Sequence, residues 1–250
     1  YEVQNDMQII SVDEPAGYNC ALTAATPIKV SVRNGSSTVL NNIPVKYRIS
    51  GGSFVNETIA SVAANTTIQY TFIATADLSA TGSYTIESIV SFPGDSFAEN
   101  DTAIVSVTNL PVVSSFPYLQ NFELNNGSWY TLGSRNSWEY GTPVSPKINR
   151  AASGSKAWKT RLVGYYNDAE LSYLYSPCFD ISAMTNPTLS FSLALDIEDC
   201  GSTLCDAAWV EYSSNGITWT KLGSVGQGTN WYNKNYAGNQ LWSQQDYIRW

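Results

Sequence analysis

The sequence predicts an all-β protein whose first part is an immunoglobulin-like β-sandwich. Short segments in which apolar and polar residues alternate recur along the whole chain, and they are rich in β-branched and aromatic side chains. Segments of Gly, Pro, Asn, Asp and Ser separate them at short intervals, as turns do. No segment sustains the spacing of apolar residues that a helix requires, so we expect strands to build the core.

The composition is that of a folded, acidic protein. The 250 residues are enough for one large or two ordinary domains. Charged residues make up 14% and aromatic residues 13%, so burial of apolar surface can offset the entropy of folding. A net charge of −8 argues against nucleic acid or an anionic membrane as partner. Since no run of 18 apolar residues occurs, we expect no membrane insertion.

Six segments before residue 110 have the period-two pattern of strands: 7–12, 28–34, 43–50, 67–74, 82–91 and 102–109. Turn residues occupy the intervals between them: 13–19, 34–38, 50–54, 63–67 and 93–100. Six or seven short strands over about a hundred residues are typical of a small immunoglobulin-like sandwich.

Two stretches of this part resemble the CARDB family of adhesion repeats. They are "VSVRNGSSTVLNNIPVKYRISGG" (30–52) and "ATADLSATGSYTIESIVSFPGDSFAENDT" (74–102), the second with a "GD…END" loop at 94–101. The resemblance implies a module similar to fibronectin type III. We interpret the carboxylates of the loop as a solvated turn capped by Asx side chains, and calcium binding is the alternative.

A linker is expected at 111–117. Pro111 and Pro117 frame it, and neither a helix nor a central strand accommodates this pattern easily. After it the composition changes, because tryptophan occurs first at Trp129 and recurs seven times. The predicted domains are therefore 1–110 and 118–250.

The second domain has its own series of expected strands: 118–123, 129–133, 138–143, 156–164, 171–182, 187–198, 207–214, 218–223 and 247–250. Its motifs resemble the MAM-like, concanavalin-type jelly rolls of bacterial surfaces: "NFE…GSW" (121–129), "ASGSKAWKT" (152–160), "LSYLYSPCFDIS…NPTLSF" (171–191) and "DAAWVEYSSNGITWTKLG" (206–223). The resemblance implies a jelly-roll β-sandwich, and we expect the domain to be truncated at its C-terminus because the closing strands of the pattern are missing.

The same resemblance implies a structural calcium site. In MAM-like jelly rolls the glutamate of the opening "FE" strand commonly contributes a ligand, which nominates Glu123, and Asp206 is its weaker companion. Calcium takes six to eight oxygen ligands, backbone carbonyls among them. The only expected cofactor is therefore Ca²⁺ in a structural role.

No enzymatic activity is expected. The sequence contains no histidine, which removes Ser-His-Asp and Cys-His catalysis and imidazole zinc sites. Catalysis by a pair of carboxylates is the remaining possibility. The acidic residues that could supply such a pair are Asp196, Glu198, Asp199, Asp206 and Glu211. The separation of five residues between Asp206 and Glu211 points them to opposite faces of an ideal strand.

The cysteines indicate an oxidising, extracellular setting. Cys200 and Cys205 are close enough in sequence for a disulfide to close a short loop, and they do not form a Cys-x-x-Cys motif. The pairing of Cys20 and Cys178 stays open because they belong to different predicted domains, and two buried free thiols are the alternative.

Aromatic residues on predicted loops are the candidate ligand-binding groups, because such side chains usually contact a partner. There are four of them: Tyr165, Tyr166, Trp231 and Tyr232. Trp209 and Trp219 lie on predicted strands and are expected in the core. Between those strands, Asn215-Gly216 predicts a tight type I′ turn and hence a structural hairpin.

The two modules in tandem are similar to secreted surface proteins of gliding bacteria that the type IX system exports. Asp101-Thr102-Ala103 resembles the O-glycosylation site of these organisms, which nominates Thr102. We therefore expect a non-catalytic segment of a large adhesin or filament-like protein that binds an extracellular glycan or protein surface and contacts other domains of its own chain. The alternative is a carbohydrate-binding accessory region of a secreted hydrolase or protease.

Overall fold

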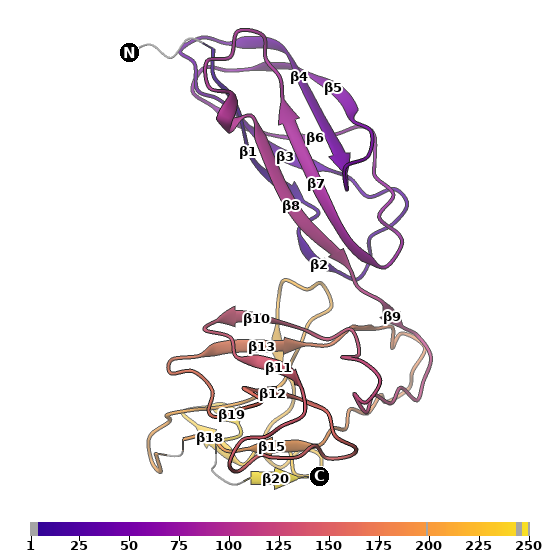
Figure 1. The fold of residues 1–250 in the computed structure, drawn as a ribbon, viewed down its shortest axis with the longest axis vertical. Coiled ribbons are helices and arrows are strands. Elements are labelled where there is room, and N and C mark those ends of the chain that lie inside the picture. Colours follow the sequence, from indigo (N-terminus) through magenta and orange to yellow (C-terminus); the bar gives the residue numbers. More distant parts are fainter. Residues whose placement is uncertain (1–4, 199, 244–246, 250) are drawn as a thin grey trace. The chain divides into compact units, whose positions relative to one another are not determined.

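The chain folds into two compact β-rich units. The computed structural model describes residues 5–198, 200–243 and 247–249. The units are Tyr1–Val112 and Val113–Trp250, so the division falls within the segment 111–117. The only helix among the described residues is the short 3-10 turn η1 (Ala98–Asn100). The predicted all-β class is confirmed (Figure 1).

Unit 1 contains two sheets, with strand orders β1-β3-β6 and β2-β8-β7-β4-β5. The pairs are antiparallel except for β2 and β8, which are parallel. The strands are β1 (Met7–Glu14), β2 (Gly17–Asn19), β3 (Lys29–Asn34), β4 (Leu40–Ile49), β5 (Val55–Val62), β6 (Thr67–Thr71), β7 (Gly82–Val90) and β8 (Thr102–Asn109).

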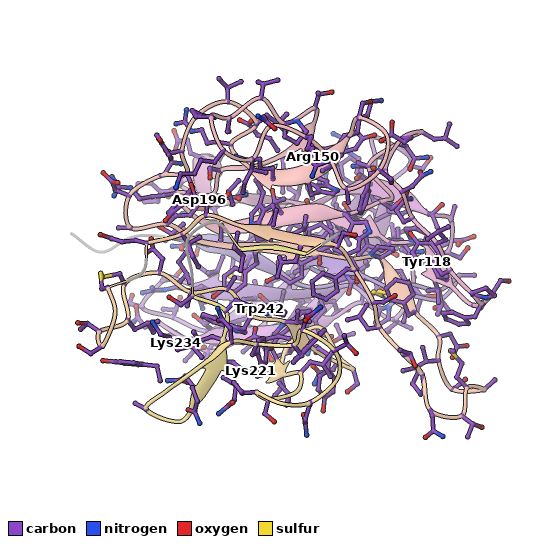
Figure 2. All side chains as sticks on the ribbon, turned by 90° about the horizontal axis from the view of Figure 1, so that it is seen from below. Tyr118, Arg150, Asp196, Lys221, Lys234 and Trp242 are labelled. Atoms are coloured by element: carbon purple, nitrogen blue, oxygen red, sulfur yellow. A yellow bond between two sulfur atoms is a disulfide. The ribbon has the colours of Figure 1, made fainter. Side chains whose placement is uncertain are left out.

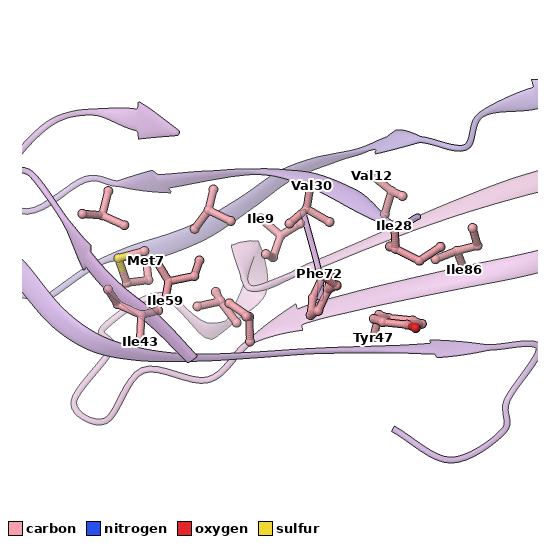
Figure 3. Close-up of a cluster of buried hydrophobic side chains, with 14 of the residues drawn as sticks. Met7, Ile9, Val12, Ile28, Val30, Ile43, Tyr47, Ile59, Phe72 and Ile86 are labelled. Atoms are coloured by element: carbon pink, nitrogen blue, oxygen red, sulfur yellow. The ribbon is translucent and has the colours of Figure 1, made fainter. Parts of the chain in front are cut away.

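The core of unit 1 lies between these two sheets (Figure 3). Because alternate residues of a strand point to opposite faces, β3 buries Val30 and Val32, while Ser31 is half-buried and Arg33 is exposed. Tyr47 of β4 is also buried; its ring meets Phe72 edge to face at 4.8 Å, and its hydroxyl donates to the Ala74 carbonyl at 3.0 Å. Each fully buried aliphatic or aromatic side chain of this kind contributes about 1.5–3 kcal/mol.

One long strand of unit 1 differs from the expectation. The sequence predicts no strand at 55–62, where β5 lies. Only Ile59 and Val62 of β5 are buried, so its apolar alternation is weak. Its pairing with β4 throughout its length places it in the sheet.

Unit 2 is built from short strands that pair two by two: β9-β14, β10-β13, β11-β12, β15-β20, β16-β17 and β18-β19. These strands are β9 (Val112–Val113), β10 (Tyr130–Ser134), β11 (Trp138–Gly141), β12 (Ala157–Thr160), β13 (Leu171–Tyr175), β14 (Cys178–Phe179), β15 (Leu193–Leu195), β16 (Glu211–Tyr212), β17 (Thr220–Lys221), β18 (Lys234–Tyr236), β19 (Asn239–Leu241) and β20 (Tyr247–Arg249). The continuous sheets of a jelly roll stay a prediction.

Several strands expected in unit 2 are absent or shorter than predicted; 207–214 and 218–223, for example, contain only the two residues each of β16 and β17. The segment 118–123 is not a strand, because Phe122 has a left-handed φ of 64° and its amide donates to the Gln120 side chain at 2.7 Å. Within 187–198 the structure has only the three residues of β15.

The core of unit 2 includes a group of aromatic side chains around Leu195. Tyr232 and Trp242 are 4% and 3% exposed, and their rings meet at 4.6 Å. Trp231 packs against both rings, at 5.5 Å from Tyr232 and 5.4 Å from Trp242. The expectation that Tyr232 is an exposed loop residue is therefore wrong.

The disulfide between Cys200 and Cys205 is confirmed, with 5.8 Å between the Cα atoms. No described cysteine is a free thiol, so the alternative of two buried free thiols is wrong. Nowhere in the described ranges is there a helix with the length and apolar character that crossing a membrane requires.

Candidate functional site

The candidate site is a group of exposed and half-buried aromatic side chains on unit 2. Trp209 and Trp219, expected in the core, are 37% and 40% exposed, so that expectation is wrong. They flank the β16–β17 hairpin, which is too short to cover their rings. We call the following residues the aromatic surface: Tyr130, Tyr173, Tyr175, Trp209 and Trp219, together with Glu211 and Lys221.

A wide loop joins β16 to β17 and carries Trp219 at its end. The Asn215 side-chain oxygen accepts the amides of Ile217 and Thr218 at 2.9 and 2.8 Å. The Ser213 hydroxyl accepts the amides of Asn215 and Gly216 at 3.2 and 2.9 Å. The predicted two-residue type I′ turn is therefore wrong, because these side chains satisfy the amides of a loop that spans residues 213–219.

Trp209 is held by a charged pair from the two strands. Its indole N–H donates to Glu211 Oε1 at 2.8 Å, and Lys221 Nζ lies 4.5 Å from the centre of its ring. Glu211 and Lys221 are cross-strand partners, so their side chains lie on the same face of the hairpin. Figure 2 labels Lys221 beside the C-terminal segments. A cation over an exposed ring contributes about 0.5–1 kcal/mol.

Tyr175 joins Trp219 to the β10–β13 pair. Its ring meets Trp219 edge to face at 5.2 Å and stacks on its cross-strand partner Tyr130 at 4.9 Å. Tyr173 lies 6.1 Å from Tyr175 on the same strand. Burial, and then the nearby phenol of Tyr173 and carboxylate of Glu211, raise the pKa of Tyr175 above its ordinary value.

The aromatic surface combines rings with a few polar groups. Flat rings offer their faces to apolar C–H groups, while Glu211 accepts hydrogen bonds and Lys221 donates them. Apolar and aromatic side chains with a few polar groups that fix orientation are the usual lining of a small-molecule site. This chemistry suits a ligand that has both C–H faces and hydroxyl groups.

The four loop aromatics predicted from sequence do not form one site. Tyr165 is 68% exposed, as expected. Trp231 is half-buried, and its indole N–H donates to the Leu222 carbonyl at 3.0 Å. Tyr232 also donates to that carbonyl, at 2.9 Å, so both residues support the β16–β17 segment from inside. The ligand-binding role of all four stays a prediction.

Tyr166 instead makes a polar contact with Asp206. Its hydroxyl donates to Asp206 Oδ2, which also accepts the Glu198 amide at 3.3 Å. Burial, followed by the hydrogen bond to Asp206, raises the pKa of Tyr166 to about 12. The only group of three acidic or thiol side chains within 4.8 Å in the described ranges is Glu198 with Cys200 and Cys205. The disulfide occupies both sulfur atoms, so this group lacks the thiolates that bind metals.

Glu123 lies elsewhere and has no hydrogen-bond partner in common with Asp206. Its Oε1 accepts the amides of Ser155 and Lys156 at 3.0 and 2.8 Å, and Oε2 accepts the Ser155 hydroxyl at 3.1 Å. These bonds, the Lys156 amide first, lower the pKa of Glu123. A Cβ on Gly154 would lie 2.3 Å from the Glu123 carboxyl carbon, so a side chain there would displace the Glu123 carboxylate from these bonds. The calcium role of Glu123 and Asp206 stays a prediction.

The known proteins that resemble this chain each match less than half of it. No family model matches the chain. A stretch of 75 residues is 39% identical to Bacillopeptidase F of Bacillus subtilis (strain 168), and it covers 30% of this chain and 5% of that protein. A solution NMR structure of the CARDB domain of a Pyrococcus furiosus protein has a TM-score of 0.35 and 18% identity, covering 42% of this chain and 94% of that domain. A crystal structure of that domain in complex with di-metal ions has a TM-score of 0.34 and 18% identity, with 44% and 96% covered.

Proposed function

We propose that this chain is a non-catalytic, secreted segment of a bacterial cell-surface protein, and that the aromatic surface of unit 2 binds a neutral extracellular glycan. The observation that carries the proposal is the exposure of Trp219 and Trp209 beside the paired Glu211 and Lys221. A pyranose ring presents a C–H face for stacking on the rings and hydroxyl groups for the carboxylate and the ammonium.

The charges favour a neutral ligand over an acidic one. Glu211 and Lys221 face each other across the hairpin, so their charges offset each other at the surface. The whole chain carries a net charge of −8, which disfavours polyanionic glycans at low ionic strength. The Cys200–Cys205 disulfide supports an oxidising compartment.

Unit 1 then has the role of a spacer that connects the binding unit to other domains of the same long chain. Its sandwich has a continuous apolar core of its own, which suits a mechanical repeat. In this proposal the chain is a type IX-exported adhesin used in gliding or attachment, and the resemblance of its sequence motifs to such proteins supports that role. Thr102 is exposed at the start of β8, where an O-linked glycan would meet solvent.

A binding screen with matched variants tests the proposal. Wild type, Trp219→Ala and Tyr212→Ala would be applied to an array of neutral and acidic oligosaccharides. Tyr212 is 54% exposed and follows Glu211 in the same strand, so its side chain points to the opposite face. We expect neutral glycans to bind wild type and Tyr212→Ala at least about tenfold more tightly than Trp219→Ala, or about 1.4 kcal/mol. Absence of any glycan binding, or equal loss in both variants, argues against it.

A second candidate function rests on the match to Bacillopeptidase F. In this alternative the chain is a carbohydrate-binding accessory region of a secreted hydrolase or protease, and the catalytic domain lies on the same polypeptide. The sequence of the complete gene product tests it. A peptidase or hydrolase domain in that sequence would support the accessory role, and a chain of repeated β-modules alone would support the adhesin.

A further inference from the structure

One end of unit 1 brings together an unusual number of acidic side chains. The segment before β1, the loop after β3 and the loop between β7 and β8 meet there. Asp95 Oδ2 accepts the amide of Met7 at 2.7 Å, and its Oδ1 accepts the amide of Phe97 at 2.8 Å. The amide of Asp6 donates to the Ser36 hydroxyl at 2.9 Å. These bonds fix the three segments against one another.

Asp6 is buried in this arrangement without a positive partner. It is only 7% exposed. Its carboxylate accepts the side-chain amides of Gln8 at 2.7 Å and Asn100 at 3.0 Å. A Cβ on Gly35 would lie 2.2 Å from Asp6 Oδ2. The Asp6 carboxylate therefore packs against the Gly35 backbone, in the space that a side chain at residue 35 would fill. Within the described ranges, no lysine or arginine forms an ion pair with Asp6, Asp95 or Asp101.

Two side-chain oxygens beside Asp6 and Asp95 are buried and have no hydrogen-bond partner. They are Oδ1 of Asn100 and Oδ1 of Asp101, and each exposes less than 1 Å². A buried oxygen in this state is destabilising unless a ligand or water meets it. The Asn100 nitrogen is already committed to Asp6, so its oxygen is free to accept a ligand.

The negative charge at this end is not compensated. Burial, followed by the charges of Asp95 and Asp6, raises the pKa of Asp101 to about 6. Asp6, Asp95 and Asp101 are thus neighbouring carboxylates without a lysine or arginine ion pair in the described ranges. Burial makes such charges costly unless an opposite charge or a proton accompanies them.

We propose that this end of unit 1 binds a hard divalent cation of the Ca²⁺ type, with Asn100 Oδ1 and Asp101 Oδ1 as ligands and Asp6 and Asp95 as the negative charges that attract it. Hard cations take carboxylate and amide oxygens. The three carboxylates do not all lie within reach of one ion, since no trio of acidic oxygens within 4.8 Å exists in the described ranges. Calcium takes six to eight oxygen ligands, so backbone carbonyls and water would supply the others. The site lies outside the aromatic surface and does not depend on it.

Calcium titration of the full chain after treatment with EDTA tests the proposal. Calorimetric binding of CaCl₂, with MgCl₂ in parallel, would be measured for wild type, Asp101→Asn and two control variants. Asp77→Asn changes an exposed acid of unit 1 that caps Ser79. Glu123→Gln changes the ligand that the sequence nominates in unit 2.

We expect calcium to bind wild type, Asp77→Asn and Glu123→Gln with similar affinity, and at least tenfold more weakly to Asp101→Asn. The melting temperature of metal-free Asp101→Asn should equal or exceed that of metal-free wild type, which would show that the variant folds. No binding to wild type at millimolar calcium, unchanged binding to Asp101→Asn, or loss of binding in Glu123→Gln alone would each overturn the assignment.

Discussion

Replacing Glu170 by alanine should destabilise unit 2 more than any other single change to an acidic side chain outside the aromatic surface. The Glu170 carboxylate accepts the amides of Ser137 and Asn167 at 2.9 and 3.1 Å. It also accepts the hydroxyls of Ser137 and Ser172. These donors come from the loop before β11, the loop before β13 and β13 itself, so one carboxylate joins the segments that support Tyr175.

The magnitude follows from the number of bonds. A hydrogen bond to a charged group contributes about 1.5–3 kcal/mol when buried. Four of them share one carboxylate that is partly open to solvent, and water replaces some of them in the variant. We therefore expect Glu170→Ala to lower the free energy of unfolding by about 2–4 kcal/mol.

The assay is urea denaturation followed by tryptophan fluorescence. All 8 tryptophans lie in unit 2, so the signal reports that unit alone. Asp180→Ala is the control, because Asp180 also caps a serine, Ser182, but at an exposed position. A midpoint shift in Glu170→Ala no larger than that in Asp180→Ala would show that the four bonds do not stabilise the unit.

Acid should weaken the same network. Burial alone would raise the pKa of Glu170, but the hydrogen bonds from Ser137 and Ser172 outweigh it and hold the pKa below its ordinary value. A group with a lowered folded-state pKa contributes stability above its unfolded pKa and loses it as the pH falls through the folded value. Below pH about 4.5 wild type should therefore lose stability faster than Glu170→Gln.

Three further outcomes are expected. Asn34→Ala should destabilise unit 1 by about 2–4 kcal/mol in calorimetry, because the fully buried Asn34 amide donates to the carbonyls of Thr38 and Val62 and these would lose their partner; a change below about 1 kcal/mol would contradict this. Replacing both Cys200 and Cys205 by serine should cost about 2 kcal/mol in urea, since the closed loop is short; no shift of the midpoint would contradict it. Hydrogen bonds, from Tyr70 first, outweigh burial and lower the pKa of Glu57, so the melting temperature of unit 1 should fall with pH below about 4.5 in wild type and less in Glu57→Gln.

Strands with strong apolar alternation could be predicted from the sequence. Segment 28–34 buries every second residue, and 82–91 does so over its second half; the structure has β3 and β7 there. β5 has polar residues at half of its positions and is fixed by its partner strand, so its own pattern does not reveal it. The segment 118–123 has the pattern of a strand but does not form one, because the left-handed backbone at Phe122 ends the extended conformation.

The candidate site was harder to predict than the fold. Trp209 and Trp219 lie beside strands, which suggests burial, but β16 and β17 have two residues each and leave the rings uncovered. Trp231 and Tyr232 lie between strands, which suggests exposure, but their polar atoms bond inward to the Leu222 carbonyl. Secondary structure alone therefore misplaces Trp209, Trp219 and Tyr232, and it does not reveal the inward hydrogen bond of the half-buried Trp231.

Titration calorimetry with a neutral polysaccharide selected from the array is the decisive measurement for the proposed binding surface. Wild type and Tyr212→Ala should bind with the same affinity, and the double variant Trp209→Ala with Trp219→Ala should show no measurable heat while keeping the circular dichroism spectrum of wild type. Equal binding by the double variant and wild type would place the glycan site elsewhere and contradict the proposed role of the aromatic surface.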